Sequence, residues 1–212
     1  PLSMALRSNI VSQRAERESS DTVVEWMEDS DFHLFQYGDV TRAQRQIREQ
    51  IVGLLGRAPG HTMPAAFQLI LDSETDGPVG LVLLQNVSWR NRACSLDVYV
   101  GQKNLRKGIV IGLAFYRIME YCFDELNLHR VSAYIYSFNS PSWRIMERSN
   151  AKRELTLKDH VVRNGQLHDM YGYGLLKREF DELRENLKGR MEGKSLIEMI
   201  DALHAKEEEA GA

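Results

Sequence analysis

The feature that most constrains the fold of this chain is a double change of hydrophobic spacing near its middle. Residues 93–100 alternate as a β-strand, apolar residues at 108–125 recur at helical spacing, and residues 129–136 alternate again. A strand, a long helix and a second, central strand predict an α/β (α+β) fold. The length of 212 residues suits one such domain with an appendage.

The strand at 93–100 has two different faces, because successive side chains point to opposite sides of a sheet. One face carries Leu96, Val98 and Val100. The other face carries Ser95, Asp97 and Tyr99. We expect the first face to pack and the second face to line a polar site.

The segments before this strand predict more of the same sheet. Residues 10–14 can form a short strand, and the apolar segments 66–71 and 80–84 flank turn-forming residues, which indicates an antiparallel hairpin. Helices are predicted near 20–27 and at 41–56, where a capping-box pattern precedes regularly spaced Ile and Leu.

The segments after residue 136 predict a helix, a hairpin and a helical tail. Ser140 and Pro141 indicate a helix start, since Ser is a good cap and Pro is tolerated in the first turn. Residues 152–162 and 166–176 form two alternating segments around an Asn-Gly turn, which predicts a hairpin. The tail then carries an apolar stripe of Leu176, Phe180, Leu183 and Leu187.

Composition narrows the classes of function. Hydrophobic residues make up 43% and charged residues 27%, and the formal net charge of -3 provides no attraction to nucleic acid or to an anionic membrane. No apolar run approaches the roughly 20 residues of a membrane span, and no secretion signal pattern is visible. Cys94 and Cys122 are too few and too scattered for a disulfide framework or a zinc site. We expect a cytoplasmic protein with core thiols, no metal, and neither a nucleic-acid nor a membrane partner.

Four local motifs accompany the predicted elements. They are Trp89-Arg-Asn-Arg92 with 96–101, Leu126-Asn-Leu-His-Arg-Val131, Asn139-Ser-Pro-Ser142-Trp-Arg-Ile-Met-Glu147, and 165–176 with Lys177-Arg-Glu-Phe180. In this order and spacing they resemble the GNAT (N-acetyltransferase) superfamily, in particular its branch of ribosomal-protein alanine N-acetyltransferases.

The resemblance implies the GNAT fold, which is a mixed, mostly antiparallel twisted sheet of about seven strands with flanking helices. We expect the GNAT domain at 1–180 and a helical C-terminal extension at 181–212. The extension needs a cover for its apolar face, either its own domain or a second subunit.

The resemblance also implies acetyl-CoA as the acyl donor. In this family a bulged strand splays from its neighbour, and its freed backbone N–H groups polarise the thioester carbonyl. That strand corresponds to 93–100, so Val98, Tyr99 and Val100 are expected to contact the carbonyl and the pantetheine arm. Asn139 is expected to hydrogen-bond the pantetheine arm, although Asn139 and Ser140 can also simply cap a helix.

The pyrophosphate of the donor is expected at the turn before the long helix, where backbone N–H groups and the helix dipole favour an anion. This chain keeps the family's Gly108 there, and Arg106 and Lys107 add positive charge. It departs from the family pattern at Leu105 and Val110, where Gln or Arg and Gly or Ala are usual. Because a β-branched side chain fills space that Gly leaves open, Val110 weakens the expected phosphate contact.

The resemblance assigns the general acid to Ser142, which would protonate the departing thiolate. Many relatives place a Tyr four residues further on, where this chain has Met146. Asp97 is the first candidate for the general base, with an ordinary polar strand residue as the equal alternative. The weaker candidates are His129, His160 and His168.

These residues together predict an N-acetyltransferase that moves an acetyl group from acetyl-CoA to a primary amine by direct attack in a ternary complex. The fold alone does not choose among acceptors, so the amine acceptor stays open between a small molecule and a peptide. Two alternatives stay open: a tailoring enzyme of secondary metabolism with another acyl donor or chemistry, and a catalytically impaired GNAT protein that acts in assembly. A homodimer is one assembly that the helical extension would allow.

Overall fold

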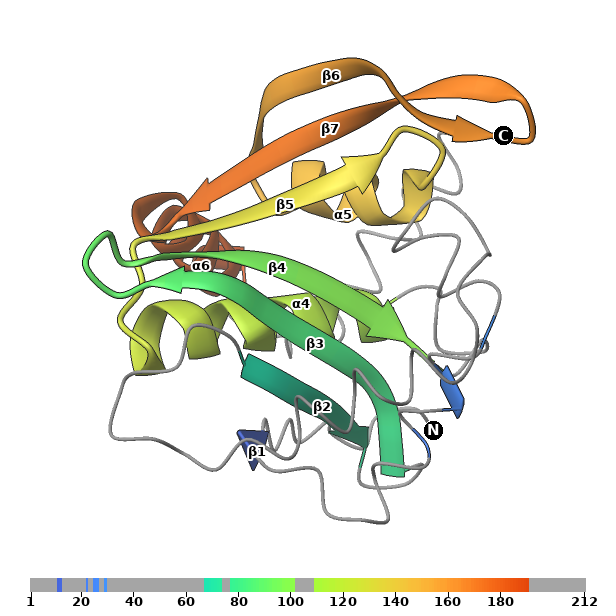
Figure 1. Cartoon of the computed structure of the whole chain (residues 1–212). Helices are drawn as coiled ribbons and strands as arrows, with labels where there is room; N and C mark the ends of the chain where they lie inside the picture. Colours follow the sequence, from blue (N-terminus) through green and yellow to red (C-terminus); the bar gives the residue numbers. More distant parts are fainter. Residues whose placement is uncertain are drawn as a thin grey trace.

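The structure is a computed structural model that describes residues 11–12, 67–73, 77–101 and 109–190, together with Thr22, Glu25, Trp26 and Asp29. The predicted helix at 41–56, residues 102–108 with most of the predicted pyrophosphate turn, and the chain beyond residue 190 lie outside the described residues. Figure 1 shows the described elements as one sheet with helices packed against it.

A seven-stranded sheet forms the centre of the molecule, with strand order β1-β2-β3-β4-β5-β7-β6. The strands are β1 (Val11–Ser12), β2 (Phe67–Ser73), β3 (Gly77–Ser88), β4 (Ala93–Val100), β5 (Arg130–Tyr136), β6 (Lys152–Arg163) and β7 (Gln166–Leu176). Only the β4 and β5 pair is parallel among the neighbouring pairs of this sheet. The predicted mixed, mostly antiparallel sheet of about seven strands is therefore confirmed.

Helix α4 (Ile109–Glu120) follows β4, as predicted, but it changes its winding before it ends. Its last turn is the π-helical segment η2 (Tyr121–Glu125), in which the N–H of Leu126 donates to the carbonyl of Tyr121 at 2.9 Å. A π-helical turn is rare, and its spacing is too close to α-helical spacing to be read from a hydrophobic pattern.

Helix α5 (Ser140–Arg148) begins at the predicted place, with Pro141 in its first turn. Its N-cap is Asn139, one residue before the predicted cap Ser140, and the Asn139 side chain makes no capping hydrogen bond. Helix α6 (Lys177–Arg190) then follows β7.

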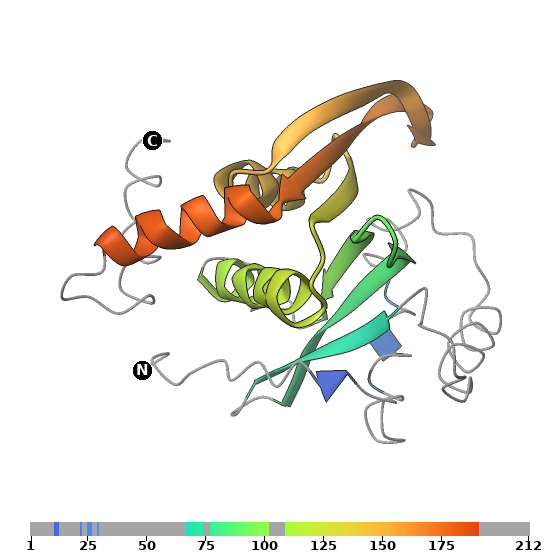
Figure 2. The same ribbon diagram turned by 90° about the vertical axis from the view of Figure 1, so that its left-hand side faces the viewer.

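The core lies between the sheet and these helices. Figure 2 shows α4 and α6 on the same side of the sheet. Most buried residues of this core come from alternating positions of the strands and from the inner faces of the helices, among them Val82, Leu84, Cys94, Leu96, Ile118, Met119, Cys122, Phe123, Val131, Ala133, Met146, Tyr173, Leu175 and Phe180. The two predicted core thiols, Cys94 and Cys122, are both buried and free of disulfides.

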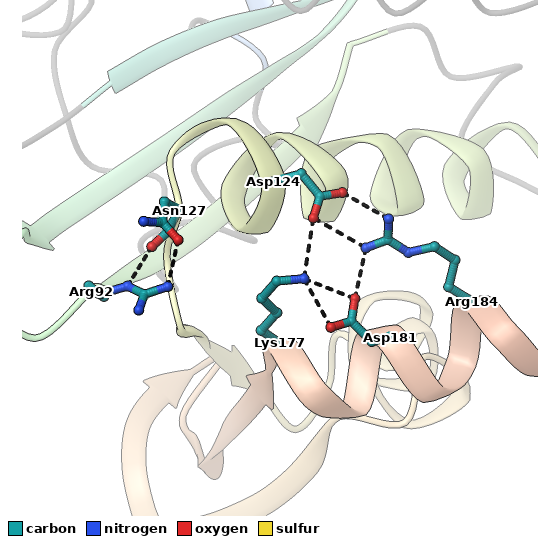
Figure 3. Close-up of polar contacts among 6 residues, drawn as sticks. All are labelled: Arg92, Asp124, Asn127, Lys177, Asp181 and Arg184. Atoms are coloured by element: carbon teal, nitrogen blue, oxygen red, sulfur yellow. Dashed lines mark hydrogen bonds and ion pairs between the residues drawn. The ribbon is translucent and has the colours of Figure 1, made fainter.

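Helix α6 packs on its own chain through Phe180, which is fully buried between Tyr116 and Phe123 with ring centroids 5.2 and 5.5 Å away. Beside this contact, Asp124 of η2 accepts hydrogen bonds from Lys177 and Arg184 of α6 (Figure 3). The described part of the C-terminal helix therefore covers its apolar face with its own domain.

The β6–β7 hairpin turns at Asn164 and Gly165, whose φ angles of 51° and 74° fit the two-residue turn predicted from Asn-Gly. Among the described residues, no helix is both long and apolar enough to cross a membrane.

Candidate functional site

β4 and β5 run side by side only at their beginnings and then separate (Figure 1). Their pairing consists of Ala93↔Arg130, Cys94↔Val131 and Ser95↔Ser132. Beyond Ser95, β4 continues along β3 to Val100, whereas β5 continues along β7 to Tyr136. We call the diverging region the fork, its paired end the root and its open end the mouth. The family resemblance implied that the strand at 93–100 would separate from its neighbour, and the fork is such a separation.

The bulge expected in β4 lies in its neighbour instead. Residues 95–100 of β4 pair with β3 in continuous register, and the register shifts between Gln85 and Ser88 of β3. The extra residue belongs to β3, where Asn86 adopts a φ of 52°, a conformation that Asn tolerates better than most residues. The separation of β4 from β5 therefore does not need a bulge in β4 itself.

The prediction for the two faces of β4 is correct up to Asp97 and wrong beyond it. Leu96 is buried in the core, but Val98, two residues further on the same face, is 37% exposed. Tyr99, which was expected on the polar face, is only 8% exposed and lies opposite buried Leu81. Val98 loses its cover because β5 has diverged at this point, so the apolar side chain lies open at the mouth.

The end of β4 approaches the N-terminal part of the chain very closely. A Cβ atom at Gly101 would lie 2.1 Å from the Trp26 ring, so only glycine allows this contact. Val100, the last residue of β4, is half-buried next to it. Trp26 therefore belongs to the surroundings of the mouth.

Asp97 lies on the face of the sheet opposite α4, where it is half-buried. Its Oδ2 accepts a hydrogen bond of 2.8 Å from Gln85 Nε2 on the neighbouring strand. A carboxylate held in this way at the mouth can pair with a cation and take a proton.

Asn139 and Ser142 lie at the same end of the molecule, because α5 begins just after the end of β5. The Asn139 N–H donates to the Tyr136 carbonyl at 2.9 Å, and the Asn139 carbonyl accepts from the N–H of Ser142 at 3.2 Å. These bonds form a tight turn in which the Asn139 side chain makes no capping bond. Asn139 therefore occupies the N-cap position, as the capping alternative expected, but its side chain is not used as a cap.

An aromatic cluster holds this turn against the β6–β7 hairpin. Phe138 stacks on Tyr136 at a centroid distance of 5.3 Å and meets the edge of His168 at 5.2 Å. The guanidinium of Arg163 lies 4.4 Å from the Phe138 ring centroid. A second contact, the bond from Trp143 Nε1 to the Ser137 carbonyl, fixes the first turn of α5.

The other end of α5 is tied to β7 by a buried hydroxyl. Tyr173, 1% exposed, donates from its hydroxyl to Glu147 Oε1 at 2.8 Å. Burial and this carboxylate raise the pKa of Tyr173 to about 12, so the phenol stays protonated. Tyr173 therefore positions α5 rather than lining the fork.

The three histidines that were weaker candidates for the base lie apart from the fork or are engaged elsewhere. His129 is exposed at the root, where its carbonyl accepts from the Lys177 N–H at 3.0 Å. His160 is exposed on the outer strand β6, and His168 packs on Phe138. Asp97 is the candidate that the structure brings to the mouth.

The root is closed by two of the sequence motifs, a contact that sequence reasoning missed. Arg92 donates from Nε to the Asn127 carbonyl at 2.7 Å and from a terminal nitrogen to Asn127 Oδ1 at 2.6 Å (Figure 3). The Arg92 carbonyl in turn accepts from the N–H groups of His129 and Arg130. The Trp-Arg-Asn-Arg and Leu-Asn-Leu-His-Arg motifs therefore join the strands of the fork.

Part of the predicted donor site cannot be placed. Leu105, Arg106, Lys107 and Gly108 lie outside the described residues, and of Val110 only the helical backbone is described. No group of three or more His, Cys, Asp or Glu side chains that could hold a metal ion occurs in the described part of the chain. A depression of about 320 Å³ is lined by residues 153–156 of β6.

Two related proteins resemble this chain over much of their sequences. An uncharacterized N-acetyltransferase, p20, of Bacillus licheniformis is 25% identical over 173 residues, which are 79% of this chain and 93% of that protein. A putative ribosomal N-acetyltransferase, YdaF, of Bacillus subtilis (strain 168) is 31% identical over 102 residues, which are 48% of this chain and 55% of that protein.

Solved structures share the fold. A spermidine N-acetyltransferase from Vibrio cholerae, in complex with CoA and spermine, superposes with a TM-score of 0.67 at 15% sequence identity. The superposition covers 78% of this chain and 94% of the Vibrio cholerae chain. A GNAT-family acetyltransferase from Bacillus anthracis gives a TM-score of 0.61 at 23% identity, covering 78% and 93%.

The family described as "Acetyltransferase (GNAT) domain" matches residues 13–152, which is more than half of the chain and includes β2 to α5. This match agrees with the sheet order, with the fork between β4 and β5, and with the N-acetyltransferase relatives. The chain is therefore an acyltransferase that belongs to the GNAT acetyltransferase family.

Proposed function

We propose that the protein transfers an acetyl group from acetyl-CoA to a primary amine by direct attack in a ternary complex. The observation that carries the proposal is the meeting of the open fork with the Asn139–Ser142 turn at one end of the sheet. Acetyl-CoA would supply the reactive thioester. The described residues fit such a donor, because Val98 is exposed in the fork and the Asn139 amide is not used for capping.

Each residue of the mouth has one role in this proposal. Backbone N–H groups of Val98, Tyr99 and Val100 would bind the thioester carbonyl and the pantetheine arm, and Asn139 would hydrogen-bond that arm. Tyr99 contributes only its backbone, because its side chain is buried. Ser142, half-buried in the first turn of α5, would donate a proton to the departing thiolate.

Asp97 would act as the general base. Its carboxylate lies on the sheet face opposite α4, so an amine can approach the fork from that side. Arg106, Lys107 and Gly108 remain our proposal for the pyrophosphate contact.

The acceptor is best searched for in two classes that the relatives suggest. The Vibrio cholerae structure is named a spermidine N-acetyltransferase, and the Bacillus subtilis relative a putative ribosomal N-acetyltransferase. We propose a small polyamine or the N-terminus of a peptide as the acceptor. The division into a GNAT domain at 1–180 and an extension at 181–212, and the homodimer, stay predictions.

The test combines binding with turnover. Calorimetry with millimolar acetyl-CoA should show binding, and thiol release should rise on addition of spermidine or of a peptide with N-terminal alanine. Neither heat nor amine-dependent thiol release would contradict the proposal. Release with a carrier-protein thioester alone would select the tailoring-enzyme alternative.

A further inference from the structure

The two strands of the fork carry polar side chains on the same face, on either side of the mouth. On β5, Val131 and Ala133 lie in the core, so the alternate residues Tyr134 and Tyr136 lie on the opposite face. On β4, Cys94 and Leu96 lie in the core, which places Asp97 on that opposite face as well. Both Asp97 and Tyr136 come after the last paired residues of the two strands.

The Tyr136 side chain has a fixed place at the mouth. Its ring stacks on Phe138 with an interplanar angle of 14°, and its carbonyl accepts from the Asn139 N–H. Burial and then the negative charge of Asp97 raise the pKa of Tyr136, so the hydroxyl remains protonated and lies within the electrostatic reach of that carboxylate.

Gln85 of β3 fixes the Asp97 carboxylate through a hydrogen bond to Oδ2. An amine acceptor reaches the enzyme mostly as an ammonium ion, which has three N–H donors and needs more than one acceptor to fix its direction. A carboxylate on one strand and a phenol oxygen on the other supply two such acceptors.

We infer that Asp97 and Tyr136 bind the ammonium group of the acceptor between them, so that Tyr136 is an acceptor-binding residue of the transfer reaction. This inference rests on the proposed function. Asp97 takes one proton from the ammonium and leaves a neutral amine, while the Tyr136 oxygen accepts a second N–H and directs the lone pair into the fork. The C–N bond then forms, the C–S bond breaks, and the thiolate receives the Ser142 proton. The second proton of the attacking nitrogen leaves as the amide forms and restores the Ser142 hydroxyl, while the proton on Asp97 passes to solvent.

The ligand class follows from these two groups. A protonated primary amine satisfies both, whereas a neutral alcohol of the same shape provides a single donor and no charge for Asp97. The site is therefore specific for cationic amines.

Tyr134 provides a matched control on the same strand and face. Its side chain is 52% exposed, and it lies two residues nearer the root. Replacing either tyrosine by phenylalanine removes one phenol oxygen and keeps the ring.

The experiment measures steady-state acetyl transfer to spermidine or to an N-terminal alanine peptide, whichever reacts faster. Tyr136→Phe should raise KM for the amine about 10-fold, the loss expected for one hydrogen bond to a charged group, and leave KM for acetyl-CoA unchanged. Tyr134→Phe should change neither constant by more than about 2-fold, because it removes an exposed group. Unchanged thermal unfolding would show that both variants fold.

A double-mutant cycle tests whether the two groups act on one ion. The variant carrying both Asp97→Asn and Tyr136→Phe should be less impaired than the product of the single effects, since either change disturbs the same ammonium. An unchanged amine KM in Tyr136→Phe, an equal rise in the acetyl-CoA KM, or strictly multiplicative effects would overturn the inference. A wild-type protein without amine-dependent turnover would instead overturn the proposed function, and the inference with it.

Discussion

The two ends of the fork are built differently although the same two strands form them. At the root, the strands pair through three residues, with Val131 and Leu175 fully buried and Arg92 bound to Asn127 on the surface. At the mouth, Val98 is exposed on one face of β4, and the opposite face carries the carboxylate of Asp97. The difference shows a division of roles, because tight packing at one end holds open a polar region at the other.

This division predicts that changes near the root act on stability and changes at the mouth act on turnover. The predictions below test the separation from the largest expected effect to the smallest.

Phe180→Ala removes the fully buried ring that anchors α6 against Tyr116 and Phe123. It should lower the free energy of unfolding by about 3–5 kcal/mol, as large-to-small changes of buried aromatics do. Urea unfolding followed by circular dichroism measures this loss. Leu167→Ala is the control, since its 58% exposed side chain should cost less than about 0.5 kcal/mol. Equal losses in both variants would show that α6 is not anchored as described.

Ser142→Ala should lower kcat about 100-fold, the lower range for loss of a general acid, with little change in unfolding temperature. Thiol release at saturating acetyl-CoA and amine measures the effect. Ser140→Ala, two residues earlier in the same turn, should keep kcat within about 2-fold, because Ser140 is half-buried like Ser142 but has no role in the proposed transfer. Full activity of Ser142→Ala would remove this residue from the mechanism.

Gly101→Ala marks the limit of this division, because the chain is tightly packed beside the mouth at the end of β4 and a change there should act on stability. The new Cβ would lie 2.1 Å from the Trp26 ring, so the contact must shift, and overpacking of this kind costs about 1–3 kcal/mol. Thermal and urea unfolding should both register the loss. A second change, Trp26→Ala, should relieve it in the double variant. An undisturbed Gly101→Ala protein would mean that Trp26 does not press on the end of β4.

Asp124→Asn removes the carboxylate that joins η2 to Lys177 and Arg184. Because the carboxylate is exposed and its two cationic partners are only partly buried, the loss should be only about 1 kcal/mol at neutral pH and smaller at high salt. Urea unfolding at low and high salt measures it, and a loss that does not depend on salt would contradict the ion-pair assignment.

Asp124 also allows a prediction of how the free energy of unfolding changes in acid. Burial alone would raise the pKa of Asp124, but the hydrogen bonds and charges of Arg184 and Lys177 outweigh it and lower the pKa. Its stabilisation is therefore present above the ordinary carboxyl pKa of about 3.9 and is lost as the pH falls further. The difference between wild type and Asp124→Asn should shrink below that pH.

The sequence predicted the elements well where local chemistry decides them. The bounds of β4 match the predicted strand at 93–100, and the Asn164-Gly165 turn fixes the hairpin that follows. These features depend on neighbouring residues, so a single chain reveals them.

Features that depend on distant partners were not visible in the sequence. Alternation predicted which face Val98 occupies, but not that β5 has left its side. The bond from Arg92 to Asn127 spans 35 positions, and the two motifs that contain them were recognised without this contact. Tyr136 was missed for the same reason, because its relation to Asp97 exists only across two diverging strands.

The π-helical turn η2 also bears on how related chains can differ in length. Such a turn contains one residue more than an α-helical turn, and it places Cys122 and Phe123 in the core while Asp124 reaches α6. A deletion of one residue here would restore ordinary winding and keep the helix, but it would rotate the carboxylate away from its partners. Length differences among homologues should therefore be tolerated at this position, and those that shorten it should also lose the cationic partners in α6.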